Sequence, residues 1–303
     1  MRYVLLAALL GAAAWCRTRY LRALEAVTVA RRRLGPNGIV VGGEGFVLER
    51  PQAPAVLLIH GGGDTPQTLR YLADALHARG FHVSAPLLPG HGRSIRDFRY
   101  VTADALSAAV SEEYARLRAS HAWVAVVGLS MGGALAVQLA AECEDLPALG
   151  LLAPYLAMPP RIERAAKLSA FWGPIIPIVR SSDGKSVLDQ LENEKNLAYG
   201  VFTAAALRAL YETMRRAVAL LPRVTAPTLM IQSREDNRIS VADGERAFAL
   251  LGARSKHLEW VTGASHVITV DFGRDAIIAR LAAFLEDQFA PRAKLQRAAT
   301  SDS

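Results

Sequence analysis

The chain has 303 residues, of which 51% are hydrophobic and 7% aromatic, and a formal net charge of +7. Residues 1–33 hold seven arginines against the single Glu25, whereas the remainder holds 28 basic and 27 acidic residues. A basic terminus on a nearly neutral body argues against nucleic acid as the ligand of the folded domain, and two cysteines exclude a disulfide framework.

The N-terminal segment is apolar and then basic. Residues 3–16 carry no charge and would span about 21 Å as a helix, less than a hydrocarbon core of about 30 Å. Arg17, Arg19 and Arg22 follow this run, which favours a cytoplasmic location for the downstream chain and an affinity for anionic lipid. We therefore expect residues 1–33 to form an anchor or interfacial helix on the cytoplasmic side of a membrane. A cleaved export signal and an apolar helix of a soluble cytoplasmic protein are the alternatives.

Short apolar runs alternate with helical patterns over most of residues 34–290. The pattern predicts an α/β fold whose sheet is mostly parallel and covered by helices on both faces, because strands buried on both faces read as continuous apolar runs. Helices are expected over residues 65–80 and 104–117. The predicted strands cover residues 55–60, 81–86, 123–128, 149–154, 227–233 and 256–263.

Residues 155–224 break this rhythm. About 70 residues is far more than a simple connection between strands requires. Apolar side chains such as Phe171, Trp172 and Ile175 need a surface to pack on, so we expect a small inserted cap over the carboxyl edge of the sheet rather than a long surface loop. The polar tail, residues 291–303, is expected to be disordered.

Residues 128–132 read Gly-Leu-Ser-Met-Gly and stand directly between an apolar strand and a helical pattern. This context is typical of a nucleophile elbow, a sharp turn whose flanking glycines avoid clashes while the serine hydroxyl is exposed. The helix that begins there directs its amide groups toward a developing oxyanion. The pattern predicts Ser130 as a nucleophile.

His60 and the glycines at 61–63 end the first predicted strand and form an HGGG sequence. Glycines at this place let the backbone approach a substrate carbonyl oxygen. The backbone N–H groups of Gly62 and Met131 are the two expected donors of an oxyanion hole. His60 itself is expected to have a structural role.

A general base and an acid should follow the serine, with the acid first in the chain. Asp236 lies just beyond a predicted strand, where α/β sheets present functional groups, and Glu235 and Asp271 compete with it. His266 lies in the loop after the last predicted strand and is the expected base. Its task would be to take the proton of Ser130 while the acid holds the imidazole. The other histidines have ordinary surface or loop positions: His77, His82, His91, His121 and His257.

Together these motifs resemble the bacterial carboxylesterases and monoacylglycerol lipases of the α/β-hydrolase superfamily, over roughly residues 54–288. The resemblance implies a triad of Ser130, Asp236 and His266, an oxyanion hole of Gly62 and Met131, and a cap over an acyl pocket. The apolar cap and the N-terminal segment favour a small acyl ester or lipid-like substrate, and a mechanism of this kind requires no metal or cofactor. Relatives carry a bulky residue at the position of Gly62 and an aromatic one near Ala105, so the chain-length preference of this pocket stays open.

Serine at position 130 excludes the relatives that use aspartate or cysteine as nucleophile. The same triad could act on lysophospholipids or thioesters, or transfer an acyl group to an acceptor other than water. A non-catalytic binding or scaffold protein is the alternative of a different class, because the fold alone does not establish activity. An intact set of triad and oxyanion residues favours the enzyme.

Overall fold

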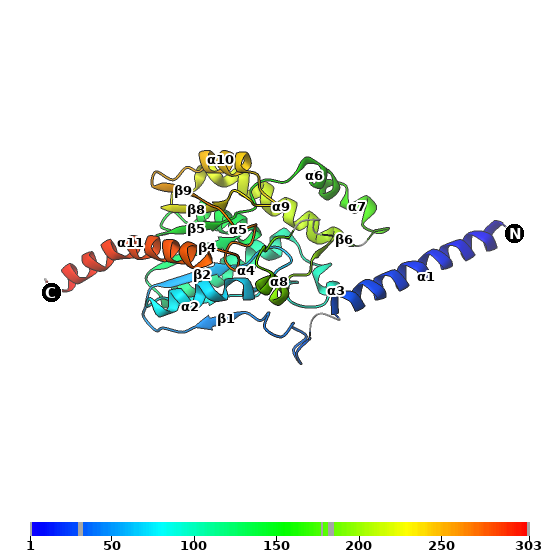
Figure 1. Ribbon diagram of the computed structural model, residues 1–303, viewed down its shortest axis with the longest axis horizontal. Helices are drawn as coiled ribbons and strands as arrows, with labels where there is room; N and C mark the ends of the chain where they lie inside the picture. The colour runs from blue at the N-terminus through cyan, green and yellow to red at the C-terminus, as the bar shows by residue number, and fades with distance from the viewer. Residues whose placement is uncertain (1, 30–32, 177, 181–184, 302–303) are drawn as a thin grey trace.

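The computed structural model describes residues 2–29, 33–176, 178–180 and 185–301. Its centre is a seven-stranded sheet in the order β1-β3-β2-β4-β5-β8-β9, with helices on both faces (Figure 1). The strands are β1 (Phe46–Leu48), β2 (Ala55–Ile59), β3 (His82–Ala85), β4 (Val124–Leu129), β5 (Leu149–Leu152), β8 (Thr228–Ser233) and β9 (Lys256–Val261).

All strand pairs of this sheet are parallel except the β1–β3 pair at the edge. The predicted α/β fold and its six predicted strands are thereby confirmed. β1 was not predicted, because a strand of three residues is too short to give a recognisable pattern. The parallel register brings the carboxyl ends of β4, β8 and β9 to one edge, from which the loops carrying the candidate residues extend.

Alternate residues of the strands supply two cores, one on each face of the sheet. Along β2, Leu57 belongs to the core that includes side chains of α4 (Ala103–Ser120), α5 (Met131–Glu142) and α9 (Ala204–Leu220). Leu58 belongs to the core that includes side chains of α2 (Arg70–Ala78) and α11 (Arg274–Ser301). The helices and 3-10 turns around the sheet are η1 (Pro66–Leu69), α2 (Arg70–Ala78), α3 (Ile95–Phe98), α4 (Ala103–Ser120), α5 (Met131–Glu142), α10 (Val241–Leu250) and α11 (Arg274–Ser301).

The segment expected to be a cap, residues 155–224, lies between β5 and β8 and contains regular structure rather than a long loop. It is connected to the body by Tyr199, whose backbone N–H donates to the oxygen of Gly63 at 2.8 Å. We call residues 155–224 the cap segment. Its elements are α6 (Pro160–Lys167), α7 (Ser169–Trp172), β6 (Ile178–Arg180), α8 (Gln190–Lys195), β7 (Val201–Thr203), α9 (Ala204–Leu220) and η2 (Leu221–Arg223).

The two terminal helices extend away from the body at opposite ends of the molecule (Figure 1). α1 (Arg2–Val29) starts at the N-terminus, and within the described ranges no helix is both long and apolar enough to cross a bilayer. α11 continues to Ser301, so the tail expected to be disordered is helical as far as that residue. Alanine, lysine, leucine, glutamine and arginine dominate this stretch and favour helix, although the stretch is polar.

Candidate active site

Ser130 occupies a strained turn between β4 and α5. Its backbone has φ 55° and ψ −118°, a conformation that costs on the order of 1–3 kcal/mol for a residue with a side chain. The flanking glycines are required by close approach, because a Cβ on Gly128 would lie 2.2 Å from the oxygen of Gly132, and a Cβ on Gly132 would lie 2.1 Å from the oxygen of Ile59. The turn therefore holds the serine side chain at the carboxyl edge of the sheet, half-buried beside α5.

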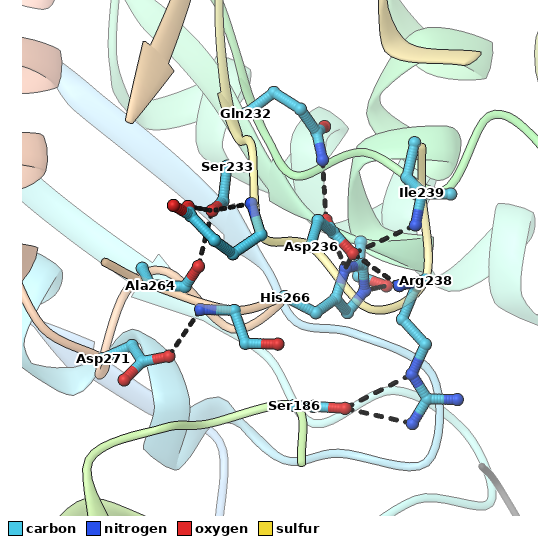
Figure 2. A network of polar contacts seen from close by, with 12 residues as sticks. Ser186, Gln232, Ser233, Asp236, Arg238, Ile239, Ala264, His266 and Asp271 are labelled. Carbon is cyan, nitrogen blue, oxygen red and sulfur yellow. Dashed lines mark hydrogen bonds and ion pairs between the residues drawn. The ribbon is translucent and has the colours of Figure 1, made fainter. Parts of the chain in front are cut away.

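His266 lies in the loop after β9 and faces both the serine and an acid. Its Nε2 is 2.7 Å from Ser130 Oγ, and its Nδ1 is 2.8 Å from Asp236 Oδ2 (the Asp236–His266 pair is drawn in Figure 2). An ionised carboxylate only accepts, so Nδ1 carries the proton and Nε2 accepts from the serine hydroxyl. This is the tautomer that a general base needs.

The carboxylate of Asp236 is fully enclosed, with 0% of the side chain exposed. Oδ1 accepts the backbone N–H groups of Arg238 at 2.7 Å and Ile239 at 3.0 Å, and Oδ2 accepts the Gln232 amide at 2.6 Å (Figure 2). Burial alone would raise the pKa of Asp236, but the neighbouring His266 and these backbone donors hold it below its ordinary value. The acid therefore stays ionised beside the histidine.

The two other acids considered from the sequence have different partners. Glu235 accepts the N–H of Gly263 and the hydroxyl of Ser233. Asp271 is buried, and its carboxylate accepts the backbone N–H groups of Ser265, Leu188 and others nearby. Asp271 thus joins the loop that carries His266 to the cap segment, a position that follows from no sequence motif.

His60 connects the glycine-rich loop to the loop of residues 87–92. Its Nε2 accepts the backbone N–H of Leu88 at 3.0 Å and its Nδ1 donates to the oxygen of Gly61 at 2.9 Å. Burial, together with the charge of His91, lowers the pKa of His60 well below its ordinary value, so the ring is neutral and can accept. A Cβ on Gly61 would lie 3.4 Å from that of Ser130, which shows how closely this loop approaches the serine.

The family described as serine aminopeptidase, S33, matches residues 50–272 of the chain. The chain belongs to this family of hydrolases. Its fold is that of the α/β-hydrolases, and the resemblance to carboxylesterases and monoacylglycerol lipases is confirmed.

Among its relatives is a thermostable monoacylglycerol lipase from Bacillus sp. (strain H-257), 29% identical over 242 residues that cover 80% of this chain and 94% of the lipase. A carboxylesterase from Bacillus subtilis (strain 168) is 25% identical over 77% of this chain and 92% of the esterase. A solved structure from work on LipS and LipT, two metagenome-derived lipolytic enzymes, has a TM-score of 0.74 at 29% identity and covers 81% of this chain and 98% of its own.

In this S33-family chain the structure brings Ser130, His266 and Asp236 together and places Gly62 against Met131, since a Cβ on Gly62 would lie 3.2 Å from Met131 Sδ. Such a site can deprotonate a hydroxyl and direct it at an electrophilic carbon. Within the described ranges, no group of three or more histidine, cysteine or acidic side chains is arranged to hold a metal ion. Gln232 and Asp271 contact this machinery and were not recognised from the sequence as its supports.

Proposed function

We propose that Ser130, His266 and Asp236 form the catalytic triad of a serine hydrolase that cleaves carboxylic esters through an acyl-serine intermediate. The observation that carries the proposal is the continuous pair of hydrogen bonds from Ser130 Oγ through the imidazole to the Asp236 carboxylate. The elbow exposes the hydroxyl of Ser130, and the imidazole of His266 is held in the tautomer that can accept its proton. Attack by a neutral hydroxyl requires both features.

The reaction follows from these positions. His266 Nε2 takes the hydroxyl proton as Ser130 Oγ attacks the ester carbonyl, and then gives that proton to the leaving alcohol. In the second half-reaction His266 takes a proton from water, which attacks the carbonyl carbon of the acyl-serine. The proton then returns to Ser130 Oγ and the carboxylic acid is released. The N–H groups of Gly62 and Met131 are the proposed donors to the oxyanion, and losing one such donor typically costs on the order of 100- to 1,000-fold in turnover.

The substrate class we infer is a small or lipid-like ester, and residues 1–33 are inferred to hold the enzyme at a membrane surface. Relatives named as a monoacylglycerol lipase and a carboxylesterase support the first inference. An uncharged run followed by arginines supports the second.

The function is tested by the rates of hydrolysis of p-nitrophenyl esters from acetate to palmitate. We expect turnover with a maximum at one chain length, because the acyl chain must fit a pocket of fixed depth. A folded enzyme that hydrolyses no ester of the series would contradict the proposal and favour thioester, lysophospholipid or non-catalytic roles.

A substitution at Gly62 tests which residue sets the preferred acyl chain length of the esters. A Cβ at this position would lie 3.2 Å from Met131 Sδ and 3.7 Å from Leu210 of α9, so a larger side chain would fill the space between the glycine loop and the cap segment. For Gly62→Leu we expect the maximum to move to shorter esters, with kcat/KM for the longest good substrate falling about tenfold or more. Acetate hydrolysis is the internal control, and a parallel loss for all chain lengths would show that Gly62 does not limit acyl length.

A further inference from the structure

An ordered turn of the cap segment presents apolar side chains to solvent. Phe171 is 78% exposed and Ile175 76% exposed. The turn is held by hydrogen bonds, since Trp172 Nε1 donates to the oxygen of Ala165 at 2.7 Å and the backbone N–H of Ile175 donates to the oxygen of Trp172 at 2.9 Å. A hydrogen-bonded turn that exposes two large apolar side chains is typical of a surface that contacts an apolar partner.

α1 projects from the same end of the molecule as α6, α7 and β6 (Figure 1). Its first turns are apolar on every side, and the large side chains of Leu5, Leu6, Leu9 and Leu10 are each more than half exposed. A helix that is apolar on all sides is buried only if its surroundings cover every side. A groove on a protein covers one side, whereas lipid covers all of them. The apolar length of about 21 Å enters a hydrocarbon core without crossing it.

Arginines lie between these two apolar parts. A cavity of about 270 Å³ is lined by Arg17 of α1, by Arg99, and by Gly173 and Pro174 of the same cap turn. A second hollow of about 340 Å³ is lined by Arg22, Arg99 and Tyr100, among others. Among the described side chains, neither Arg17 nor Arg99 forms an ion pair. Positive charge at the base of the apolar projections is complementary to anionic headgroups.

We propose that α1, the cap turn of residues 168–176 and the arginines between them form one surface that binds an anionic phospholipid bilayer. The apolar side chains enter the acyl region, and Arg17 and Arg99 lie at the headgroup phosphates. This inference rests on the proposed function. If the enzyme hydrolyses lipid esters, the surface would bring its cap into contact with the membrane in which such substrates are dissolved.

The test is sedimentation of the full chain with vesicles of phosphatidylcholine alone and of phosphatidylcholine containing one quarter phosphatidylglycerol. We expect binding to the anionic vesicles that weakens with salt. Phe171→Ser with Ile175→Ser should lower partition at least about tenfold, and Arg17→Glu about fivefold or more on anionic vesicles. Leu250→Ser and Arg254→Glu are the matched controls, because α10 and the loop after it lie far from α1 (Figure 1).

Hydrolysis of p-nitrophenyl acetate by each variant shows that the site is intact, so a failure of docking is distinguished from a failure of the esterase proposal. Partition of the cap variant equal to that of the unmodified chain would overturn the proposal, and so would absence of binding to both kinds of vesicle. Equal loss in the matched controls would also overturn it.

An independent inference concerns Gln232 of β8. Its side chain is fully buried, its amide nitrogen donates to Asp236 Oδ2 at 2.6 Å, and its amide oxygen has no partner among the described atoms. We infer that Gln232 is a positioning residue that holds the acid and limits the negative charge it presents to His266. An unpaired buried oxygen lowers stability, so the side chain is poorly explained by a structural role alone.

Replacing Gln232 by methionine tests this role, because methionine has a similar shape and no donor. Without the donor the carboxylate stabilises the imidazolium more strongly, so the acidic limb of the kcat/KM profile should move to higher pH by on the order of half a unit. We expect kcat to fall about tenfold and the melting temperature to be unchanged or higher. Thr228→Val, another buried polar change in β8, is the control. An unshifted pH profile, or the same shift in the control, would overturn the inference.

Discussion

Replacement of Ser130 by alanine lowers kcat/KM for p-nitrophenyl butyrate by about 10⁴- to 10⁶-fold, because no other group takes over the covalent step. The same change abolishes labelling by a fluorophosphonate probe, which reacts with the activated hydroxyl. Rates and labelling are measured on protein whose melting temperature shows it to be folded. Substantial residual hydrolysis would identify a different nucleophile, and folded unmodified enzyme that fails to label would favour the binding or scaffold alternative.

The backbone of Ser130 offers a control for this experiment. Glycine adopts φ near 55° without the strain imposed by a side chain, so Ser130→Gly should be inactive yet melt higher than the unmodified protein by about 2 °C or more. An inactive variant that is more stable separates loss of chemistry from loss of fold. A lower melting temperature would show that the elbow stores no strain.

His266→Ala and Asp236→Asn are expected to lower kcat/KM by about 10⁴-fold or more and about 10⁴-fold, respectively. Without the imidazole the serine hydroxyl has no base at 2.7 Å, and an asparagine can donate to Nδ1 and so favour the wrong tautomer. Initial rates on one soluble ester measure both effects, with the melting temperature as the check on folding.

Glu235→Gln is the matched control for Asp236→Asn, since it makes the same chemical change at the adjacent residue. Glu235 contacts Ser233 and Gly263 rather than His266, so we expect activity within about threefold of the unmodified enzyme. If Glu235→Gln were the inactive variant and Asp236→Asn the active one, the assignment of the acid would be reversed.

Local sequence was sufficient wherever a local physical constraint is strong. The central parallel strands appear as apolar runs because both of their faces pack against helices. These strands and the more polar edge strand β9 were predicted. The elbow was predicted because its glycines follow from close approach: a Cβ at Gly128 would clash with Gly132 of α5, and a Cβ at Gly132 would clash with Ile59 of β2. β1 and the antiparallel β6–β7 pair were not predicted, since three-residue strands carry too little pattern to distinguish them from loops.

The sequence by itself determined the fold class, the strained serine turn, and a histidine and an acid in the right order along the chain. It favoured Asp236 over Glu235 and Asp271 by position alone, and it did not single out Gln232. Only the tertiary structure shows that Asp236 contacts His266 and that Gln232 contacts Asp236. Ser130 and His266 are 136 positions apart, and the order of strands in the sheet, rather than any local periodicity, sets which side chains meet at its edge. The hollow that Arg17 of α1 shares with Gly173 and Pro174 of the cap turn is likewise seen only in the structure, because charge and hydropathy do not tell which segments lie next to each other.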